Sequence, residues 1–433
     1  MTYAEKLSKM IQVETISQKG EKNLHKFYAF HKVLEELFPN IHAKMEKRDF
    51  EGSLMFYLKG TGERAPLMLM SHMDVVEATG EWKHPPFSGH IDGKRVWGRG
   101  TLDTKGSLFA LMQAVEEMLE NDITLPFDLY LVTSCTEEVG GEGCIAMAKY
   151  LKDNNINIGL LIDEGGAIMN EPMKGAKGKF AMIGVIEKGG GNLKIIARSK
   201  GGHSSTPPKN TPIARLAAFV NHIEKHDPFR VEISPQVERM LEVLSTNMEG
   251  VLGLAIKNKQ YTAPLIKLIM PKVSPTAGAM LKTTIAFTMQ GGSQGANVLP
   301  QEAYVVANLR FIPHQNKDES IEIIKKIAKK YDLEVEVMSA RPATRPTDIN
   351  GEGYKYVEKT LNKVFPDVLV SPYVMVGGTD SRFYAGVTKD IIRFAPIFMD
   401  DQQYASVHGT NENVFIDALP KAVEFYKEIV KGY

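Results

Sequence analysis

The chain has 433 residues, of which 43% are hydrophobic and 24% are charged. This length is well above the ~150 residues typical of one domain, so we expect two domains and a sizeable hydrophobic core, which excludes a mainly disordered or fibrous chain. Basic and acidic residues each number 52, so the net charge is zero. This excludes an overall positive potential that would attract nucleic acid or an anionic membrane, although local basic patches are still compatible with it.

Strands and helices alternate through the first 185 residues. Short apolar runs predict buried strands at 66–70, 127–134 and 158–162. Apolar residues at helical spacing predict a helix at 107–120, and a second helix is predicted at 144–152. This order favours an α/β fold with a largely parallel, mixed sheet and helices on both faces.

The pattern changes at a run of three glycines, residues 189–191, which we interpret as a boundary. The elements predicted beyond it are strands at 192–198, 283–289, 303–311 and 333–338, and helices at 211–225 and 319–330. This order predicts a small α+β, ferredoxin-like sheet covered by two helices, which residues 227–282 enlarge. We therefore expect a first part of a catalytic domain at 1–188, an inserted lid domain at 189–341 and the second part of the catalytic domain at 342–433.

Acidic and imidazole side chains follow the predicted strands or begin helices. They are His72, Asp74, Asp103, Glu137, Glu138, Asp163 and His408. The carboxyl ends of parallel strands converge on a ligand crevice, so five separate segments could surround one point. Two histidines with several carboxylates suit a pair of divalent cations that share a bridging carboxylate. Such ions lower the pKa of a water and polarise a carbonyl, and a further carboxylate must then take and return the proton.

Each of these residues alone has an ordinary structural interpretation. His72 alone is most often a satisfied hydrogen-bonding residue, Asp103 alone suits the N-cap of the following helix, and Glu137 and Glu138 suit a solvated loop. Asp163 alone could cap a turn, and His408 alone indicates little. The coincidence of ligand types at five element boundaries favours the metal site.

Two other motifs point to rival enzyme classes. Residues 291–295 match the GxSxG pattern of serine hydrolases, but a nucleophile elbow needs a helix after the serine, and here a strand follows. Residues 141–146 imitate a dinucleotide-binding fingerprint, but Glu137, Glu138 and Glu142 crowd the place of a pyrophosphate. A non-catalytic metal-binding relative is a third alternative.

Eight stretches together resemble the co-catalytic zinc metallopeptidases that include aminoacylase, glutamate carboxypeptidases and carboxypeptidase S. They are residues 71–107, TEEVGGEG, LLIDEGGAI, GVIEKGGGNL, GGHSSTPPKNT, NVLP, GGTDSRFY and VHGTNE. Their order covers about residues 65 to 415, nearly the whole chain. The branch that looks most similar holds carboxypeptidase S and the N-acyl-amino-acid hydrolases.

The resemblance implies a role for each candidate ligand. His72 and Asp163 would bind one zinc ion, Glu138 and His408 would bind the other, and Asp103 would bridge both. Cobalt or manganese could substitute for zinc, since carboxylate-rich sites accept several ions.

Two further carboxylates receive supporting roles. Glu137 would be the general base that activates the water and then protonates the leaving amine. Asp74 would orient the imidazole of His72, a pairing that the need to fix a ligand tautomer also favours.

The resemblance also implies the substrate contacts and the reaction. His203 would polarise the scissile carbonyl, often of the neighbouring subunit, Asn297 would contact the substrate, and Arg310 would grip its carboxylate. Gly378 would line the pocket. We expect hydrolysis of an amide or peptide bond beside a free-carboxylate amino acid, as by a carboxypeptidase or N-acyl-amino-acid hydrolase. A dipeptidase or an aminopeptidase of the same family is the alternative.

The remaining expectations concern surroundings and partners. With only Cys135 and Cys144, the chain has no disulfide scaffold, which favours a reducing compartment. No stretch approaches the 18 apolar residues of a membrane span, so we expect a cytoplasmic protein. The expected partners are a small-molecule or short-peptide substrate and a second copy bound through the lid, with no nucleic acid and no membrane.

Overall fold

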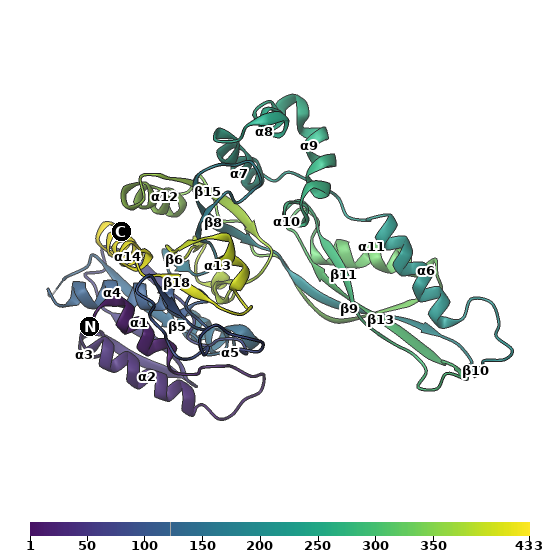
Figure 1. Ribbon diagram of the computed structural model, residues 1–433, viewed down its shortest axis with the longest axis horizontal. Helices are drawn as coiled ribbons and strands as arrows, with labels where there is room; N and C mark the ends of the chain where they lie inside the picture. Colours follow the sequence, from purple (N-terminus) through teal and green to yellow (C-terminus); the bar gives the residue numbers. More distant parts are fainter. Residues whose placement is uncertain (122) are drawn as a thin grey trace.

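The computed structural model describes residues 1–121 and 123–433, and its two larger β-sheets lie in two separate parts of the molecule (Figure 1). The larger part holds a ten-stranded sheet and both chain ends, and the smaller part holds a four-stranded sheet. Within the described residues, none of the helices combines the length and the apolar character needed to cross a membrane.

The ten-stranded sheet has the order β1-β2-β5-β3-β6-β16-β8-β7-β17, with β15 also paired to β8. The strands are β1 (Glu46–Phe50), β2 (Ser53–Leu58), β3 (Arg64–Met70), β5 (Phe127–Thr133), β6 (Leu160–Asp163), β7 (Ile168–Asn170), β8 (Lys179–Glu187), β15 (Val368–Met375), β16 (Ile391–Arg393) and β17 (Phe398–Met399). The pairs β5–β3, β3–β6 and β6–β16 are parallel, whereas β1–β2, β2–β5 and β7–β8 are antiparallel. The predicted mixed α/β sheet is thus confirmed.

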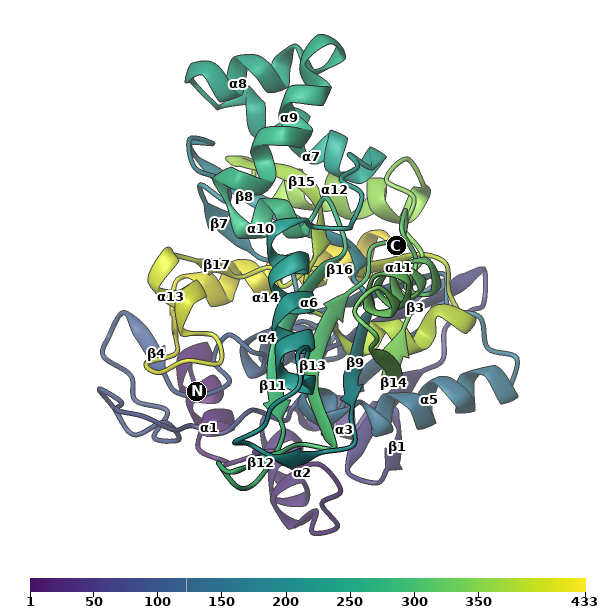
Figure 2. The same ribbon diagram turned by 90° about the vertical axis from the view of Figure 1, so that its right-hand side faces the viewer.

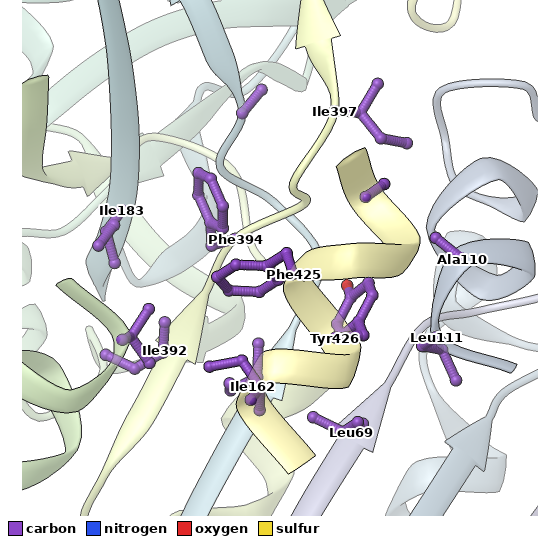
Figure 3. Packing of buried hydrophobic residues seen from close by; sticks show 14 of the residues in the cluster. Leu69, Ala110, Leu111, Ile162, Ile183, Ile392, Phe394, Ile397, Phe425 and Tyr426 are labelled. Carbon is purple, nitrogen blue, oxygen red and sulfur yellow. The ribbon is translucent and has the colours of Figure 1, made fainter. Parts of the chain in front are cut away.

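Alternate residues of the central strands face opposite layers, as the period of two requires. On β3, Leu67 and Leu69 join one hydrophobic cluster, whereas Met68 and Met70 join another. The first layer contains α4 (Lys105–Leu119) and α14 (Ala418–Gly432), which pack against each other. Figure 3 shows Leu69 in this layer beside side chains from α4 and α14.

Further elements surround these two layers. They are α1 (Tyr3–Ile11), α2 (His25–Leu37), α3 (Pro39–Lys44), α5 (Glu142–Asp153), α12 (Glu352–Val364), α13 (Asp401–Ser406), the 3-10 helices η1 (Glu137–Val139) and η2 (Asp380–Gly386), and a small sheet of β4 (Arg95–Trp97) with β18 (Asn413–Phe415). Helix α5 packs on the opposite face of the sheet from α4, with η2, β1 and β2. Both faces of the central strands are therefore covered, which explains their nearly continuous apolar sequences.

The four-stranded sheet is wholly antiparallel and has the order β11-β13-β9-β14. Its elements are β9 (Gly190–Arg198), β11 (Thr284–Gly291), β13 (Glu302–Arg310), β14 (Glu334–Arg341), α6 (Pro212–Lys225) and α11 (Lys317–Lys329). The two helices and the sheet enclose a hydrophobic cluster of their own. A two-stranded ribbon of β10 (Gly202–His203) and β12 (Val298–Leu299) extends from the end of this sheet that lies far from the ten-stranded sheet (Figure 1).

Four helices between α6 and β11 pack elsewhere. They are α7 (Pro235–Thr246), α8 (Gly250–Lys257), α9 (Lys259–Val273) and α10 (Pro275–Ala279). Helix α7 contacts β15, and its apolar residues Val237, Met240 and Leu241 belong to the large cluster of the ten-stranded sheet. Residues 235–279 thus lie against the larger part, although we expected them to enlarge the lid, and the domain bounds at 188 and 341 stay a prediction.

Candidate metal centre and its surroundings

Three neighbouring parallel strands place candidate ligands at one edge of the large sheet. His72 follows β3, Glu137 and Glu138 form η1 shortly after β5, and Asp163 ends β6. Because β5, β3 and β6 are adjacent and parallel, their carboxyl ends meet at the same edge. The side chains that follow them are brought together by the topology of the sheet.

Asp103 lies between the two histidines. Its Oδ1 is 3.0 Å from Nε2 of His72, and its Oδ2 is 2.9 Å from Nε2 of His408. Asp103 precedes α4, and His408 follows α13 with a left-handed backbone at φ 58°. Asp103 is not the N-cap of α4, since Thr104 occupies that position. Each oxygen of one carboxylate therefore faces a different imidazole, which is the arrangement of a bridging ligand.

The histidines keep the bridging carboxylate ionised. Burial opposes ionisation of Asp103, but hydrogen bonds from His408 and His72 outweigh it and hold the pKa of Asp103 below its usual range. Conversely, the hydrogen bonds to Asp103 and Glu138 raise the pKa of His408 to about 10. The cluster thus concentrates negative charge that a cation would balance.

Glu138 offers a free ligand atom to this cluster. Its Oε2 is 3.3 Å from Nε2 of His408, and within the described part of the chain its buried Oε1 has no hydrogen-bond partner. One ligand atom each from His72, Asp103 and Glu138 lie within 4.8 Å of one another. Imidazole and carboxylate donors at this spacing, with one buried oxygen unpaired, fit divalent metal ions.

Glu137 has the properties of a proton carrier. Burial, together with the nearby carboxylates Asp380 and Glu138, raises the pKa of Glu137 well above its usual value, although His72 opposes the shift. A carboxylate whose pKa is raised towards neutrality is suited to general acid–base catalysis. Burial also raises the pKa of Glu138, but Glu138 differs from Glu137 because it pairs with His408, which opposes the shift.

Asp74 contacts the imidazole of His72, as its expected orienting role requires, and it also holds a neighbouring segment. The Nδ1 of His72 lies 2.8 Å from the backbone carbonyl of Asp74 and 3.4 Å from its carboxylate. The buried carboxylate of Asp74 also accepts hydrogen bonds from the backbone N–H groups of Glu137 and Glu138 at 3.2 and 3.1 Å, and from the hydroxyl of Ser17 at 2.7 Å. Asp74 therefore holds the backbone of both glutamates.

The carboxylate of Asp163 is fixed by the backbone, and each of its oxygens keeps a second lone pair, so its role as a ligand stays a prediction. Its Oδ1 accepts from the N–H of Glu164 and its Oδ2 from the N–H of Ser381, both at 2.9 Å. Sequence reasoning missed Glu164, whose pKa is raised well above its usual value by burial and by the charge of Asp103, against the opposing effect of His72. The carboxyl of Glu164 thus lies in the field of the cluster, and the only available signal was its adjacency to Asp163.

His203 and Asn297 lie apart from this cluster. Both are exposed, and the N–H of Ser204 donates to the carbonyl of Asn297 across the ribbon of β10 and β12. Figure 1 places β10 at the far end of the four-stranded sheet. The structure therefore brings His203 and Asn297 together, but not to the candidate ligands of the same chain.

Arginines that the sequence did not single out lie beside Glu137. Arg382 is 3.7 Å from Oε1 of Glu137. A Cβ atom at Gly378 would lie 2.7 Å from Nη2 of Arg341 and 3.3 Å from Nη1 of Arg382, so a larger residue there would displace these guanidinium groups. Arg310 is exposed at the end of β13, and a Cβ at Gly190 would lie 3.6 Å from its Nη1 and 3.7 Å from Nε of Arg341. The only sequence signal was the position of Arg382 in the stretch GGTDSRFY.

The two rival motifs occupy sites unsuited to their chemistry. Ser293 is exposed in the turn between β11 and β12, where its hydroxyl contacts the carbonyl of Gly295, and a strand rather than a helix follows. Gly141 precedes α5 directly after Glu137 and Glu138. Residues 291–295 are therefore not a nucleophile elbow. Residues 141–146 begin a helix beside several carboxylates, which is unsuited to a pyrophosphate.

Fold and site together define a metal-dependent hydrolase. The family model "Peptidase family M20/M25/M40" matches residues 68–432, so the chain belongs to this family of metallopeptidases.

Two curated relatives match along nearly the whole chain. It is 32% identical over 441 residues to human N-fatty-acyl-amino acid synthase/hydrolase PM20D1, which covers 99% of this chain and 87% of that protein. It is 29% identical over 446 residues to probable carboxypeptidase S-like 2 of Dictyostelium discoideum, with 99% and 84% covered. Among solved structures, the M20 family metallo-carboxypeptidase Sso-CP2 of Sulfolobus solfataricus matches with a TM-score of 0.69 at 20% identity, covering 99% of this chain and 98% of that one, which shows a shared fold.

Proposed function

We propose that this chain uses two zinc ions to hydrolyse an amide or peptide bond beside an amino acid with a free carboxylate. The observation that carries this proposal is the position of Asp103, which faces His72 and His408 with its two oxygens. Glu137 and Glu138 are held next to this group by one buried carboxylate. The arrangement supplies both the ligands and the proton carrier that metal-dependent hydrolysis needs.

The ligands divide into two sets that share Asp103. We assign His72 and Asp163 to one ion, because each Asp163 oxygen accepts a single backbone hydrogen bond and keeps a lone pair, with the neighbouring Glu164 as the alternative ligand. Glu138 and His408 serve the second ion. Imidazole with carboxylate suits zinc, and cobalt or manganese are reasonable substitutes.

The protein's own residues then handle the proton. When bound, two such ions lower the pKa of a water and polarise the substrate carbonyl. Glu137 takes a proton from the attacking water and returns it to the leaving amine, a role that its raised pKa favours because a more basic carboxylate accepts a proton more readily. Asp74 keeps Glu137 in position through the backbone.

The arginines beside Glu137 favour a substrate with a carboxylate. Arg382, Arg341 and Arg310 form a chain of guanidinium groups that leads from Glu137 to the end of β13. Burial and the charge of Arg382 lower the pKa of Arg341, so an anion bound there would relieve the repulsion. A guanidinium binds a carboxylate with two parallel hydrogen bonds.

This charge also discriminates between activities. An aminopeptidase must hold a protonated α-amine close to the scissile bond, which three arginines would repel. A C-terminal carboxylate or that of an N-acyl amino acid fits the same group. N-acyl amino acids, including those with fatty acyl groups as in the name of the human relative, are therefore our first candidates, followed by dipeptides cleaved at the C-terminal side.

A panel of N-acyl amino acids and dipeptides tests this function through amino-acid release by the zinc-loaded protein. We expect Glu137→Gln to keep its metal and to lose at least about a hundredfold in rate, the usual contribution of general acid–base catalysis. Glu142→Gln, an exposed substitution in the first turn of α5, is the matched control and should keep its activity. Normal turnover by Glu137→Gln would refute the assignment of the base.

We also propose that His203 holds the oxyanion in a site that it does not reach within this conformation. It is exposed at the far end of the four-stranded sheet, and it is available either to the same chain after lid closure or to a second copy. The expected homodimer through the lid supports the second route.

The cysteines support a cytoplasmic location. Cys135 and Cys144 are both free and buried. Burial raises the pKa of the Cys135 thiol to about 12, so it resists oxidation. Free thiols are typical of a reducing compartment.

A further inference from the structure

The outer surfaces of α8 and α9 are unusually apolar. Of the sixteen large hydrophobic side chains exposed among the described residues, six lie between positions 251 and 269, whereas scattered single ones are ordinary. We call this group the α8–α9 face, and it consists of Val251, Leu254, Tyr261, Leu265, Leu268 and Ile269. Val251 is 86% exposed, Tyr261 81% and Leu254 65%.

The apolar character is arranged around the helices in a definite pattern. On α9, Tyr261, Leu265 and Leu268 follow one another at spacings of four and three, which puts them on one side of the helix. Ile266 and Met270 on α9 are buried in the large hydrophobic cluster. The inner side thus anchors the helix, and the outer side projects from the edge of the molecule, where α8 and α9 form the top in Figures 1 and 2.

Charge is distributed just as unevenly. Residues 250–301 contain five lysines and no aspartate, glutamate or arginine, in a chain whose total charge is zero. Lys257 and Lys272 are exposed near the ends of α8 and α9. The acidic side chains nearby are paired, since Glu238 and Glu242 of α7 contact Lys259, and Glu249, the N-cap of α8, contacts Lys177. The whole-chain balance therefore hides a basic segment.

We propose that the α8–α9 face docks on an anionic lipid surface. Helices with apolar side chains on the outer surface and lysine as their only charged residue bind in the interface of such membranes, where the apolar groups insert and the lysines meet the headgroups. A second copy of the chain suits the face less well. A symmetric dimer would bring the same lysines together without an opposing acid.

Docking through this face leaves the metal centre outside the contact. Helix α8 packs on α7, which contacts β15, and α9 packs on α8, whereas the candidate ligands His72, Glu138 and Asp163 lie at the ends of β3, β5 and β6. The protein would be held at a membrane in which long-chain acyl compounds dissolve. The proposal does not depend on the proposed hydrolysis, because it concerns a different surface.

Vesicle sedimentation of the full-length protein tests the proposal without any need for turnover. We expect sedimentation with vesicles of phosphatidylcholine mixed with phosphatidylglycerol, weaker sedimentation with pure phosphatidylcholine, and weakening by added salt. The double substitution Leu254→Ser with Leu268→Ser should weaken binding by about tenfold or more, since each removes a large inserted group. Ile145→Ser with Ile213→Ser, also exposed but on α5 and α6, is the matched control and should bind normally.

Substitution of the lysines tests the electrostatic contribution to vesicle binding. Lys257→Gln with Lys272→Gln should remove the preference for phosphatidylglycerol, whereas Lys152→Gln, on the exposed surface of α5, should not. Thermal melting by circular dichroism establishes that each variant is folded. The proposal would be overturned if the wild type failed to bind vesicles or if all variants bound equally. It would also be overturned if light scattering showed that Leu254→Ser with Leu268→Ser turns a dimer into a monomer while vesicle binding is unchanged.

Discussion

Replacement of Asp74 by asparagine tests whether one buried carboxylate positions both glutamates of the site. In Asp74→Asn an amide NH₂ takes the place of one oxygen, so at least one of the N–H groups of Glu137 and Glu138 faces another donor. A hydrogen bond to a charged group contributes about 1.5–3 kcal/mol, and a buried unpaired N–H costs about 1–3 kcal/mol. We therefore expect a stability loss on the order of 2–4 kcal/mol and a displaced η1 backbone.

The displacement should reduce the rate by about 10–100-fold, as is usual for groups that orient metal ligands. Amino-acid release and metal content after dialysis are the two measurements. Ser17→Ala is the matched control, because it removes only the hydroxyl that donates to Asp74 and leaves both backbone contacts. The reasoning is refuted if Asp74→Asn keeps half of the wild-type rate, or if Ser17→Ala loses as much activity as Asp74→Asn.

Two further predictions concern the lid and the segment that leads to it. If His203 serves a second copy, an equimolar mixture of His203→Ala and Glu137→Gln that is refolded together should regain about a quarter of the wild-type rate. Half of the dimers then contain one chain of each variant, and one of the two sites in each such dimer is intact. A mixture as inactive as its components would show that each chain uses its own His203. Burial lowers the pKa of Lys188 from 10.5 to about 7, so between these values the unfolded chain binds the extra proton and stability rises with pH. Urea unfolding should show the stability of the wild type relative to Lys188→Met increasing by on the order of 1 kcal/mol per pH unit from about pH 7.5 to 9.5, and a flat difference would contradict the shift.

The grouping of His72 and Glu138 could be predicted from chain topology, whereas Asp103, before α4, and His408, after α13, joined it through their residue types and the family resemblance. Short apolar runs indicate parallel strands, and polar residues directly after such strands meet at one edge of the sheet. The choice between Asp163 and Glu164 could not be made in this way. At a strand end consecutive side chains point in opposite directions, and an error of one residue in the boundary exchanges the two carboxylates.

The placement of residues 235–279 was equally hidden. Helix α7 has a clear apolar side, but the pattern does not tell which sheet that side covers, and the surrounding strands all belong to the four-stranded sheet. Val237 and Met240 pack instead in the cluster of the ten-stranded sheet. The sequence does not indicate a role for Arg341 for a similar reason, because only the tertiary fold brings it next to Gly378 and Arg382.

The connection between the two sheets is anchored to the candidate site. Glu187, the last residue of β8, is fully buried and accepts hydrogen bonds from the hydroxyls of Thr379 and Ser381, each at 3.1 Å, as well as pairing with Arg393. The N–H of Ser381 in turn donates to Asp163. Removing one partner of a buried ion pair typically costs about 3–5 kcal/mol of protein stability. The pair with Arg393 therefore fixes this end of the connection firmly.

If the four-stranded sheet rotates as a lid, the rotation is therefore expected to begin just beyond Glu187. At Gly189 the outgoing chain passes so close to the returning one that a Cβ would lie 2.5 Å from the carbonyl oxygen of Arg341 and 2.6 Å from the nitrogen of Ala343. The two segments that connect the sheets thus touch at this point and define one axis. Rotation of the four-stranded sheet about this axis would leave β8 in place. It would move the ribbon that carries His203 furthest, because the ribbon lies at the far end of that sheet. The same rotation would move Arg310, at the end of β13, relative to Arg382, so closure would adjust the carboxylate site and carry His203 in a single motion.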